Sequence, residues 1–141
     1  MLARRELSEA QVRQRLARRG HDETAIDSAI ERLRENRAID DSRVAEAIAR
    51  TETSLKRRGR IRVRRQIERA GIAGATARRA LDEVFEGLDS QELLEAALRK
   101  RLRGRDTIAD EKEFARLFRY LVAQGFESDA IMKALRARRA R

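Results

Sequence analysis

The stretch Leu16–Ile30, "LARRGHDETAIDSAI", contains a pattern that returns twice farther along the chain. The related stretches are Ile67–Leu81, "IERAGIAGATARRAL", and Leu121–Leu135, "LVAQGFESDAIMKAL". Around each central glycine, apolar residues stand four and eight positions before it and six, nine and ten positions after it. Apolar residues at such spacings share one face of an α-helix, and glycine commonly follows the last residue of a helix. The pattern therefore predicts three copies of a unit in which two helices meet at a glycine turn.

A third helix is expected before each of the last two copies. Ile39–Ile48, "IDDSRVAEAI", aligns with Leu88–Ala97, "LDSQELLEAA", and both contain an aspartate that can cap the helix after it. We therefore predict an all-α fold, an elongated tandem array of three-helix repeats. The expected helices span residues 8–19, 22–36, 41–56, 60–70, 74–86, 89–102, 110–124 and 127–139.

The same alignment divides the chain into repeats at 1–38, 39–87 and 88–141. The first repeat lacks most of its opening helix, because only Leu2–Glu6 precedes the capping box that begins at Ser8. We therefore expect the chain to begin inside a repeat. An apolar surface near Val12 and Leu16 would then lack its cover, and self-association through the first repeat is one way to bury it.

The composition supports helices and restricts the functional classes. The chain has 141 residues, 41% of them charged, with no proline, no cysteine and only five aromatic residues. Without cysteine, neither a disulfide framework nor a thiolate metal site can form. No apolar run reaches the length of a membrane span, and the first residues do not resemble a signal peptide, so we expect a cytoplasmic protein. A net charge of +10 favours a polyanionic partner or an acidic protein surface.

The positive charge is concentrated in two clusters. Leu55–Ala70 contains eight basic residues and one acidic residue, and Arg99–Arg105 contains five basic residues. Both clusters involve the turn between the first and second helix of a repeat, so stacked repeats could align them into a stripe that suits a phosphate backbone. The alternative is that these side chains pair with carboxylates on neighbouring helices. The candidate contact residues are Arg57, Arg58, Arg60, Arg62, Arg65, Arg69, Arg99, Lys100, Arg101, Arg103 and Arg105.

The residues give little support to catalysis. The chain has one histidine, His21, which follows a helix-ending glycine, and it contains no glycine-rich phosphate loop. His21–Leu55 carries nine acidic and five basic residues, so this part has a net charge of −4 and could face a basic protein surface. Within it, Asp40 and Asp41 fit a helix cap better than a metal site, which would need further ligands. We therefore predict a non-enzymatic protein that has no metal and no cofactor.

Four segments together resemble the RecX family, the bacterial regulators of the RecA recombinase. They are "ARRELSEAQVRQRLARRG" (3–20), "RENRAIDDSRVAEAIAR" (34–50), "KRRGRIRVRRQIERAGI" (56–72) and "RLFRYLVAQGFESDAIMKAL" (116–135). The resemblance lies in the order of the motifs over essentially the whole chain. The matching positions are Arg5, Ser8, Gln11, Val12, Asp40, Asp41, Arg43, Val44, Ala45, Arg58, Gly59, Ile61, Gly71, Ile72, Tyr120, Leu121, Gly125, Phe126 and Ile131.

The resemblance implies a modulator that binds the RecA nucleoprotein filament and restrains its ATP hydrolysis and strand exchange. Direct contact with DNA phosphates is compatible with such a role. The residues alone leave two other readings open. One is an autonomous DNA-binding module of helix-turn-helix type, and the other is a helical-repeat scaffold for an unrelated protein.

Overall fold

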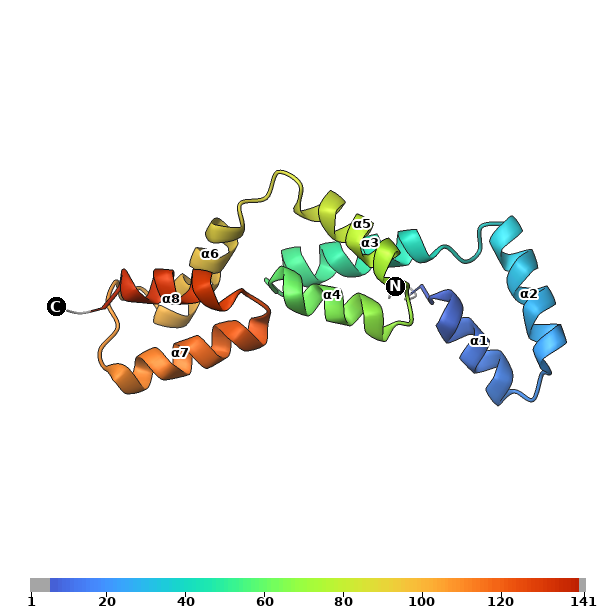
Figure 1. Ribbon diagram of the computed structural model, residues 1–141, viewed down its shortest axis with the longest axis horizontal. Coiled ribbons are helices and arrows are strands. Elements are labelled where there is room, and N and C mark those ends of the chain that lie inside the picture. Colours follow the sequence, from blue (N-terminus) through green and yellow to red (C-terminus); the bar gives the residue numbers. More distant parts are fainter. Residues whose placement is uncertain (1–5, 140–141) are drawn as a thin grey trace.

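The chain forms an elongated row of helices in three successive groups (Figure 1). The computed structural model describes residues 6–139. The first group is α1 (Glu9–Arg18) and α2 (Glu23–Glu35). The second is α3 (Asp41–Arg50), which a π-helical turn, η1 (Thr51–Leu55), prolongs, followed by α4 (Arg60–Arg69) and α5 (Gly74–Phe85). The third is α6 (Ser90–Leu102), α7 (Glu111–Gln124) and α8 (Ser128–Arg136). The predicted all-α repeat array is confirmed, and the expected helix ends agree closely with these bounds.

Polar side chains cap most of the helices where the sequence suggested it. Ser8 and Gln11 form a reciprocal capping box at the start of α1. The carboxylates of Asp40 and Asp89 accept backbone N–H groups at the starts of α3 and α6. Each such cap typically stabilises a protein by about 1 kcal/mol, because it satisfies an N–H group that has no partner inside the helix. The positions of Ser8, Asp40 and Asp89 immediately before these helices are therefore explained by capping.

Each group packs around its own apolar core. The second core contains Val44, Val63, Ile67 and Leu81, and the third contains Leu94, Leu98, Leu121 and Ile131 among others. Alanines fill much of the space between α3, α4 and α5, which lets these helices approach closely.

The first group has the smallest core. Ile26, Ile30 and Ile39 are buried there, and the half-buried Val12 and Leu16 pack against them. Of the expected remnant of an opening helix, only Glu6 lies inside the described residues. Ile39 packs with the first group although the alignment places it at the start of the second repeat, so the division at residues 38 and 87 stays a prediction.

The helices α7 and α4 meet end to end. The N–H of Gly59 donates to the carbonyl of Gln124 at 2.7 Å, and the N–H of Ile61 donates to the carbonyl of Gly125 at 3.1 Å. No side chain within residues 6–139 caps α4, whose N-cap is Gly59. The last carbonyls of α7 therefore satisfy backbone donors at the start of α4, and the two helix dipoles run head to tail.

Glycine is required at this junction because the two backbones touch. Gly125 ends α7 with φ +101°, and a Cβ there would lie 2.4 Å from the Cβ of Arg62. A Cβ on Gly59 would lie 2.5 Å from the carbonyl carbon of Gly125. A larger residue at either position would push α4 and α7 apart.

A second junction joins α4 to α1. The hydroxyl of Ser8, which is fully buried, donates to the carbonyl of Ala70 at the end of α4. A Cβ on Gly71 would lie 2.4 Å from the Cβ of Ala10, so the two chains are close here as well. The helices α7, α4 and α1 therefore follow one another in chain direction along one side of the molecule (Figure 1).

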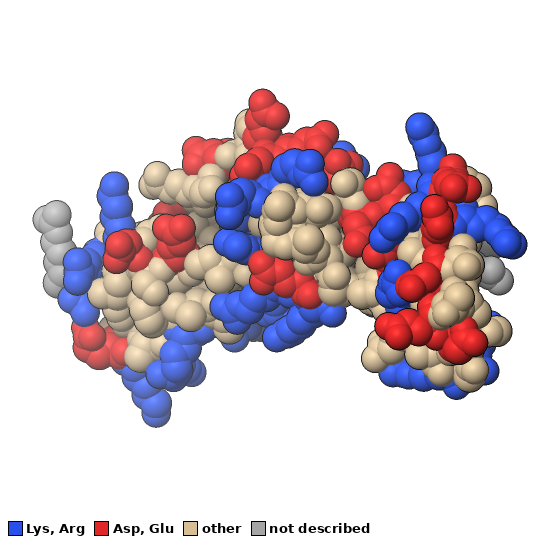
Figure 2. Space-filling model, turned by 45° about the vertical axis from the view of Figure 1, so that its right-hand side comes forward, with Lys and Arg blue, Asp and Glu red and all other residues tan. Residues whose placement is uncertain are grey.

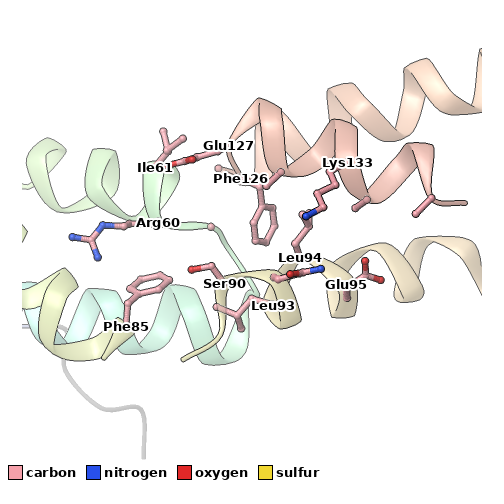
Figure 3. Close-up of a pocket in the computed structure, with 16 residues that line it drawn as sticks. Arg60, Ile61, Phe85, Ser90, Leu93, Leu94, Glu95, Phe126, Glu127 and Lys133 are labelled. Carbon is pink, nitrogen blue, oxygen red and sulfur yellow. The ribbon is translucent and has the colours of Figure 1, made fainter. Parts of the chain in front are cut away.

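Beside the α7–α4 junction, a cleft of about 500 Å³ lies between the second group and the third, and Gly59 and Gly125 are among the residues that line it. Figure 3 shows Phe85, Arg60 and Ile61 on one side and Phe126 and Lys133 on the other, with the ring of Phe126 pointing into the space. The backbone hydrogen bonds between α7 and α4 are therefore a narrow link between two separately packed groups.

Candidate nucleic-acid interface

Three basic residues of α4 lie opposite its buried face. Arg62, Arg65 and Arg69 follow one another at intervals of three and four residues, whereas Val63 and Ile67 point into the core. Arg65 and Arg69 are exposed, and no carboxylate among residues 6–139 forms an ion pair with either. Arg62 is half-buried, and its Nη1 donates to the carbonyl of Ala123 at 3.0 Å. Arg62 therefore holds the junction, while Arg65 and Arg69 are available to a partner.

Three further basic residues occupy the equivalent side of α7. Lys112, Arg116 and Arg119 are all exposed and share a narrow arc with Ala123, at intervals of three and four residues. The buried residues of α7 lie on the opposite side. These three residues were not among the predicted contact residues. Their spacing opposite the apolar positions was a usable signal.

The contact between Arg62 and Ala123 brings the two arcs together. Arg62 belongs to the basic side of α4, and Ala123 lies in line with the basic residues of α7. The two basic sides therefore meet where the helices meet. We call the combined surface the basic face, and it consists of Lys112, Arg116, Arg119, Arg62, Arg65 and Arg69. Figure 2 shows Lys and Arg side chains gathered along the lower margin of the left and middle parts of the molecule.

The second predicted cluster joins the basic face at the start of α7. Arg101, Arg103, Arg105 and Arg116 line a shallow pocket of about 340 Å³ together with Glu113 and Leu117. Arg99 and Lys100 are exposed at the end of α6. The guanidinium of Arg101 lies 4.1 Å above the ring of Tyr120, which fixes its position beside α7.

The two predicted clusters do not lie side by side as a stripe. The turn at residues 56–59 contacts the end of α7, whereas Arg103 and Arg105 lie beside its first half, near Glu113 and Arg116. The physical reason is that the α7–α4 contact is end to end, so equivalent turns are separated by the length of a helix. Arg116 and Arg119 bridge that interval.

Two predicted contact residues are neutralised within the chain. Arg60 pairs with Asp82 and lies 5.8 Å from the ring centre of Phe85. Arg105 makes two hydrogen bonds to Glu113, at 3.0 and 2.9 Å. For these two residues the alternative of internal pairing fits the structure.

The remaining predicted residues precede α4. Arg57 is exposed and has φ +55°, and Arg58 is half-buried with its Nε enclosed. Neither has a carboxylate partner in the described part of the chain.

The Glu113 carboxyl is expected to titrate below the ordinary glutamate pKa of 4.5. The hydrogen bonds from Arg105 and then from the N–H of Ala109 stabilise its charged form and lower its pKa. Stability from this carboxylate is present above its unfolded-state pKa and is lost as the pH falls through the lowered folded-state pKa. An NMR titration of the side-chain carboxyl measures this pKa, and Arg105→Gln should raise it. An unchanged pKa in that variant would contradict the assignment.

A second carboxyl, that of Glu46, also has a shifted pKa. The pKa of Glu46 is raised, chiefly because its carboxyl shares a hydrogen bond with Glu83 across α3 and α5. Among residues 6–139, no three carboxylate or imidazole side chains gather in a way that could hold a metal ion. Asp40 caps α3 and Asp41 accepts the N–H of Glu9, so both have structural partners. Within the same residues, no helix combines the length and apolar character needed to cross a membrane.

Family models match both ends of the chain. The first three-helix domain of RecX matches residues 1–33, and the third three-helix domain of RecX matches residues 89–135. A crystal structure of RecX from Lactobacillus salivarius superposes with a TM-score of 0.71 at 20% identity, covering 93% of this chain and 84% of that one. That likeness concerns the fold.

Sequence relatives extend the match over nearly the whole chain. The regulatory protein RecX of Halorhodospira halophila is 33% identical over 138 residues, which cover 97% of this chain and 83% of the relative. The regulatory protein RecX of Syntrophotalea carbinolica is 31% identical over 134 residues, 94% of this chain and 88% of the relative. The chain belongs to the RecX family of regulatory proteins.

Proposed function

We propose that this protein is a non-enzymatic regulator, most simply an inhibitor, that binds the RecA–DNA filament and restrains its ATP hydrolysis and strand exchange. The basic face is the observation that supports it best, because its residues on α7 and α4 lie opposite the buried faces of both helices and meet where the helices meet. Family membership supports the regulatory role. A cytoplasmic location is part of this proposal, because the proposed partner, RecA, acts on DNA.

The dimensions of the basic face suit a nucleic-acid backbone. At 1.5 Å per residue, the two helical segments from Lys112 to Ala123 and from Arg62 to Arg69 together extend roughly 30 Å. That length is comparable with one turn of a duplex, roughly 34 Å. Cations spread over it can neutralise several phosphates at once and release their counterions, so binding should weaken steeply with salt.

The acidic part of the chain suits a different surface of the same assembly. Residues 21–55 carry a net charge of −4 and include α2, along which acidic residues recur at intervals of four. A protein that contacts DNA with one part and a basic protein surface with another can lie across a nucleoprotein filament. Self-association through the half-buried residues of the first group is a separate prediction, which sedimentation tests.

Binding measurements separate this function from its alternatives. The protein is titrated against naked single-stranded DNA, naked duplex and a RecA–nucleotide–DNA filament at moderate salt. Much tighter binding to the filament, with slower ATP turnover, supports the proposal. Tight, sequence-dependent duplex binding would support an autonomous DNA-binding module of helix-turn-helix type, and binding to none of the three would support a scaffold.

The double variant Arg65→Ser/Arg69→Ser should weaken filament binding at least tenfold at 0.1 M salt, because each phosphate contact is worth roughly five- to tenfold there. Circular dichroism should show unchanged helicity, since both side chains are exposed and unpaired among residues 6–139. If the affinity of the double variant depended on salt as that of the wild-type protein does, α4 would not be part of the interface.

A further inference from the structure

Leu55 is the most exposed large apolar residue in the described part of the chain. Its exposed fraction is 78%, compared with 43% for Leu88 and 39% for Ile61. A single exposed leucine usually has no significance. Here, however, the local backbone conformation directs the side chain of Leu55 into the solvent.

The π-helical turn η1 determines where Leu55 points. If α3 continued as an α-helix, Leu55 would fall eleven residues after Val44 and seven after Ile48, on the core-facing side. The π-helical turn holds an extra residue and rotates the following side chains away from that face. Glu52 and Thr53 remain buried while Leu55 is directed to solvent.

Hydrogen bonds hold this turn in place. The N–H of Lys56 donates to the carbonyl of Thr51 at 3.3 Å, and the N–H of Arg58 donates to the carbonyl of Glu52 at 2.9 Å. Arg57 between them takes a left-handed conformation with φ +55°. Such a conformation is unfavourable for an arginine, so the surrounding contacts maintain it.

The charges around Leu55 indicate the class of partner. No acidic residue occurs from Thr53 to Ile67, a stretch that contains seven basic residues. Lys56 pairs with Glu52 behind the turn, but Arg57 and Arg58 have no carboxylate partner within residues 6–139. An apolar side chain beside unneutralised cations fits a strand whose phosphates bind the cations while an unstacked base packs on the leucine.

We propose that Leu55 is an apolar anchor for an unstacked base of a bound nucleic-acid strand, with η1 holding it in position. The inference rests on the proposed function, since it assumes that this side of the second group approaches DNA. It assigns base contact to the turn before α4 and phosphate contact to the basic face.

A tryptophan at position 55 tests base contact directly. The chain contains no tryptophan, so Leu55→Trp introduces a single emission reporter. Adding an oligodeoxythymidylate should quench its fluorescence by stacking, whereas inorganic polyphosphate, which offers phosphates without bases, should leave it unchanged. Leu88→Trp is the matched control, an exposed leucine flanked by acidic residues, and should respond to neither. Equal responses of Leu55→Trp to both polyanions would overturn the proposal.

Truncation of the side chain gives a second, independent readout. Leu55→Ala should weaken oligodeoxythymidylate binding about three- to tenfold and leave polyphosphate binding unchanged, because only the base would lose apolar contact with the side chain. Arg65→Ser/Arg69→Ser should weaken both. An unchanged melting temperature for Leu55→Ala would exclude a folding defect.

The failures of the two proposals are distinguishable. If Leu55→Ala binds the oligonucleotide as wild type does while the arginine variant loses it, the anchor is wrong and the proposed function stands. If Leu55→Ala instead loses only filament binding, the leucine enters a protein pocket, which also overturns base contact. If the wild-type protein binds neither DNA nor filament, the proposed function itself fails.

Discussion

Replacing Gly125 with alanine is expected to lower the free energy of unfolding by about 3 kcal/mol. The left-handed conformation of this residue, φ +101°, costs an alanine about 1–2 kcal/mol. The new methyl group would also lie 2.4 Å from the Cβ of Arg62 and 2.5 Å from its backbone nitrogen. Forcing these atoms apart adds about 1–3 kcal/mol, since the methyl group meets the backbone of α4 and the Cβ attached to it.

The chain provides a matched control for this substitution. Gly20 occupies the equivalent position after α1, with φ +90°, and a Cβ there meets no atom within 4 Å. Gly20→Ala should therefore lower the unfolding free energy by only about 1–2 kcal/mol, the conformational part alone. Urea unfolding followed by circular dichroism measures both variants. Equal losses would show that the end-to-end junction does not contribute to stability.

Reversing two charges on α7 is expected to weaken DNA and filament binding roughly 100-fold at 0.1 M salt. Arg116 and Arg119 lie in the middle of the basic face, and each phosphate contact is worth roughly five- to tenfold at that salt concentration. Arg116→Glu/Arg119→Glu removes two contacts and adds repulsion. The slope of log affinity against log salt should also become shallower by roughly 2. Fluorescence anisotropy at several salt concentrations gives both quantities.

Arg78→Glu/Arg79→Glu is the control for net charge. These adjacent arginines are exposed on α5 and are not among the six residues of the basic face. The change in net charge is the same, so a general electrostatic effect would weaken both double variants alike. An equal loss in the two would therefore remove the basic face as a distinct interface.

The sequence was sufficient to predict the helices and the all-α repeat architecture. Apolar spacing around Gly20, Gly71 and Gly125, with the capping aspartates, defines local structure through contacts between residues close in the chain. Such local structure can be predicted from sequence because the apolar residues recur with the period of an α-helix. The π-helical turn after α3 was not predictable in this way, since the spacing of Val44, Ile48 and Leu55 suits a continuous α-helix.

The candidate site was only partly predictable. The arginines of α4 were identified from their density in one segment. Their connection to Arg116 and Arg119 depends on which helix ends meet, and that depends on the backbone contact between Gly59 and Gln124, residues far apart in sequence. Likewise, the pairing of Arg60 with Asp82 requires the tertiary arrangement of α4 and α5. Local patterns cannot supply such long-range information.

The junction between α7 and α4 has a consequence for how this fold can diverge. Apart from the hydrogen bond of the Arg62 side chain, its hydrogen bonds join main-chain atoms, which every amino acid except proline can supply, and the two glycines are constrained by space. Most other positions can therefore change during evolution without altering the spacing of successive modules. The surface charges can therefore change to suit a new partner, while the distance between successive helical groups stays the same.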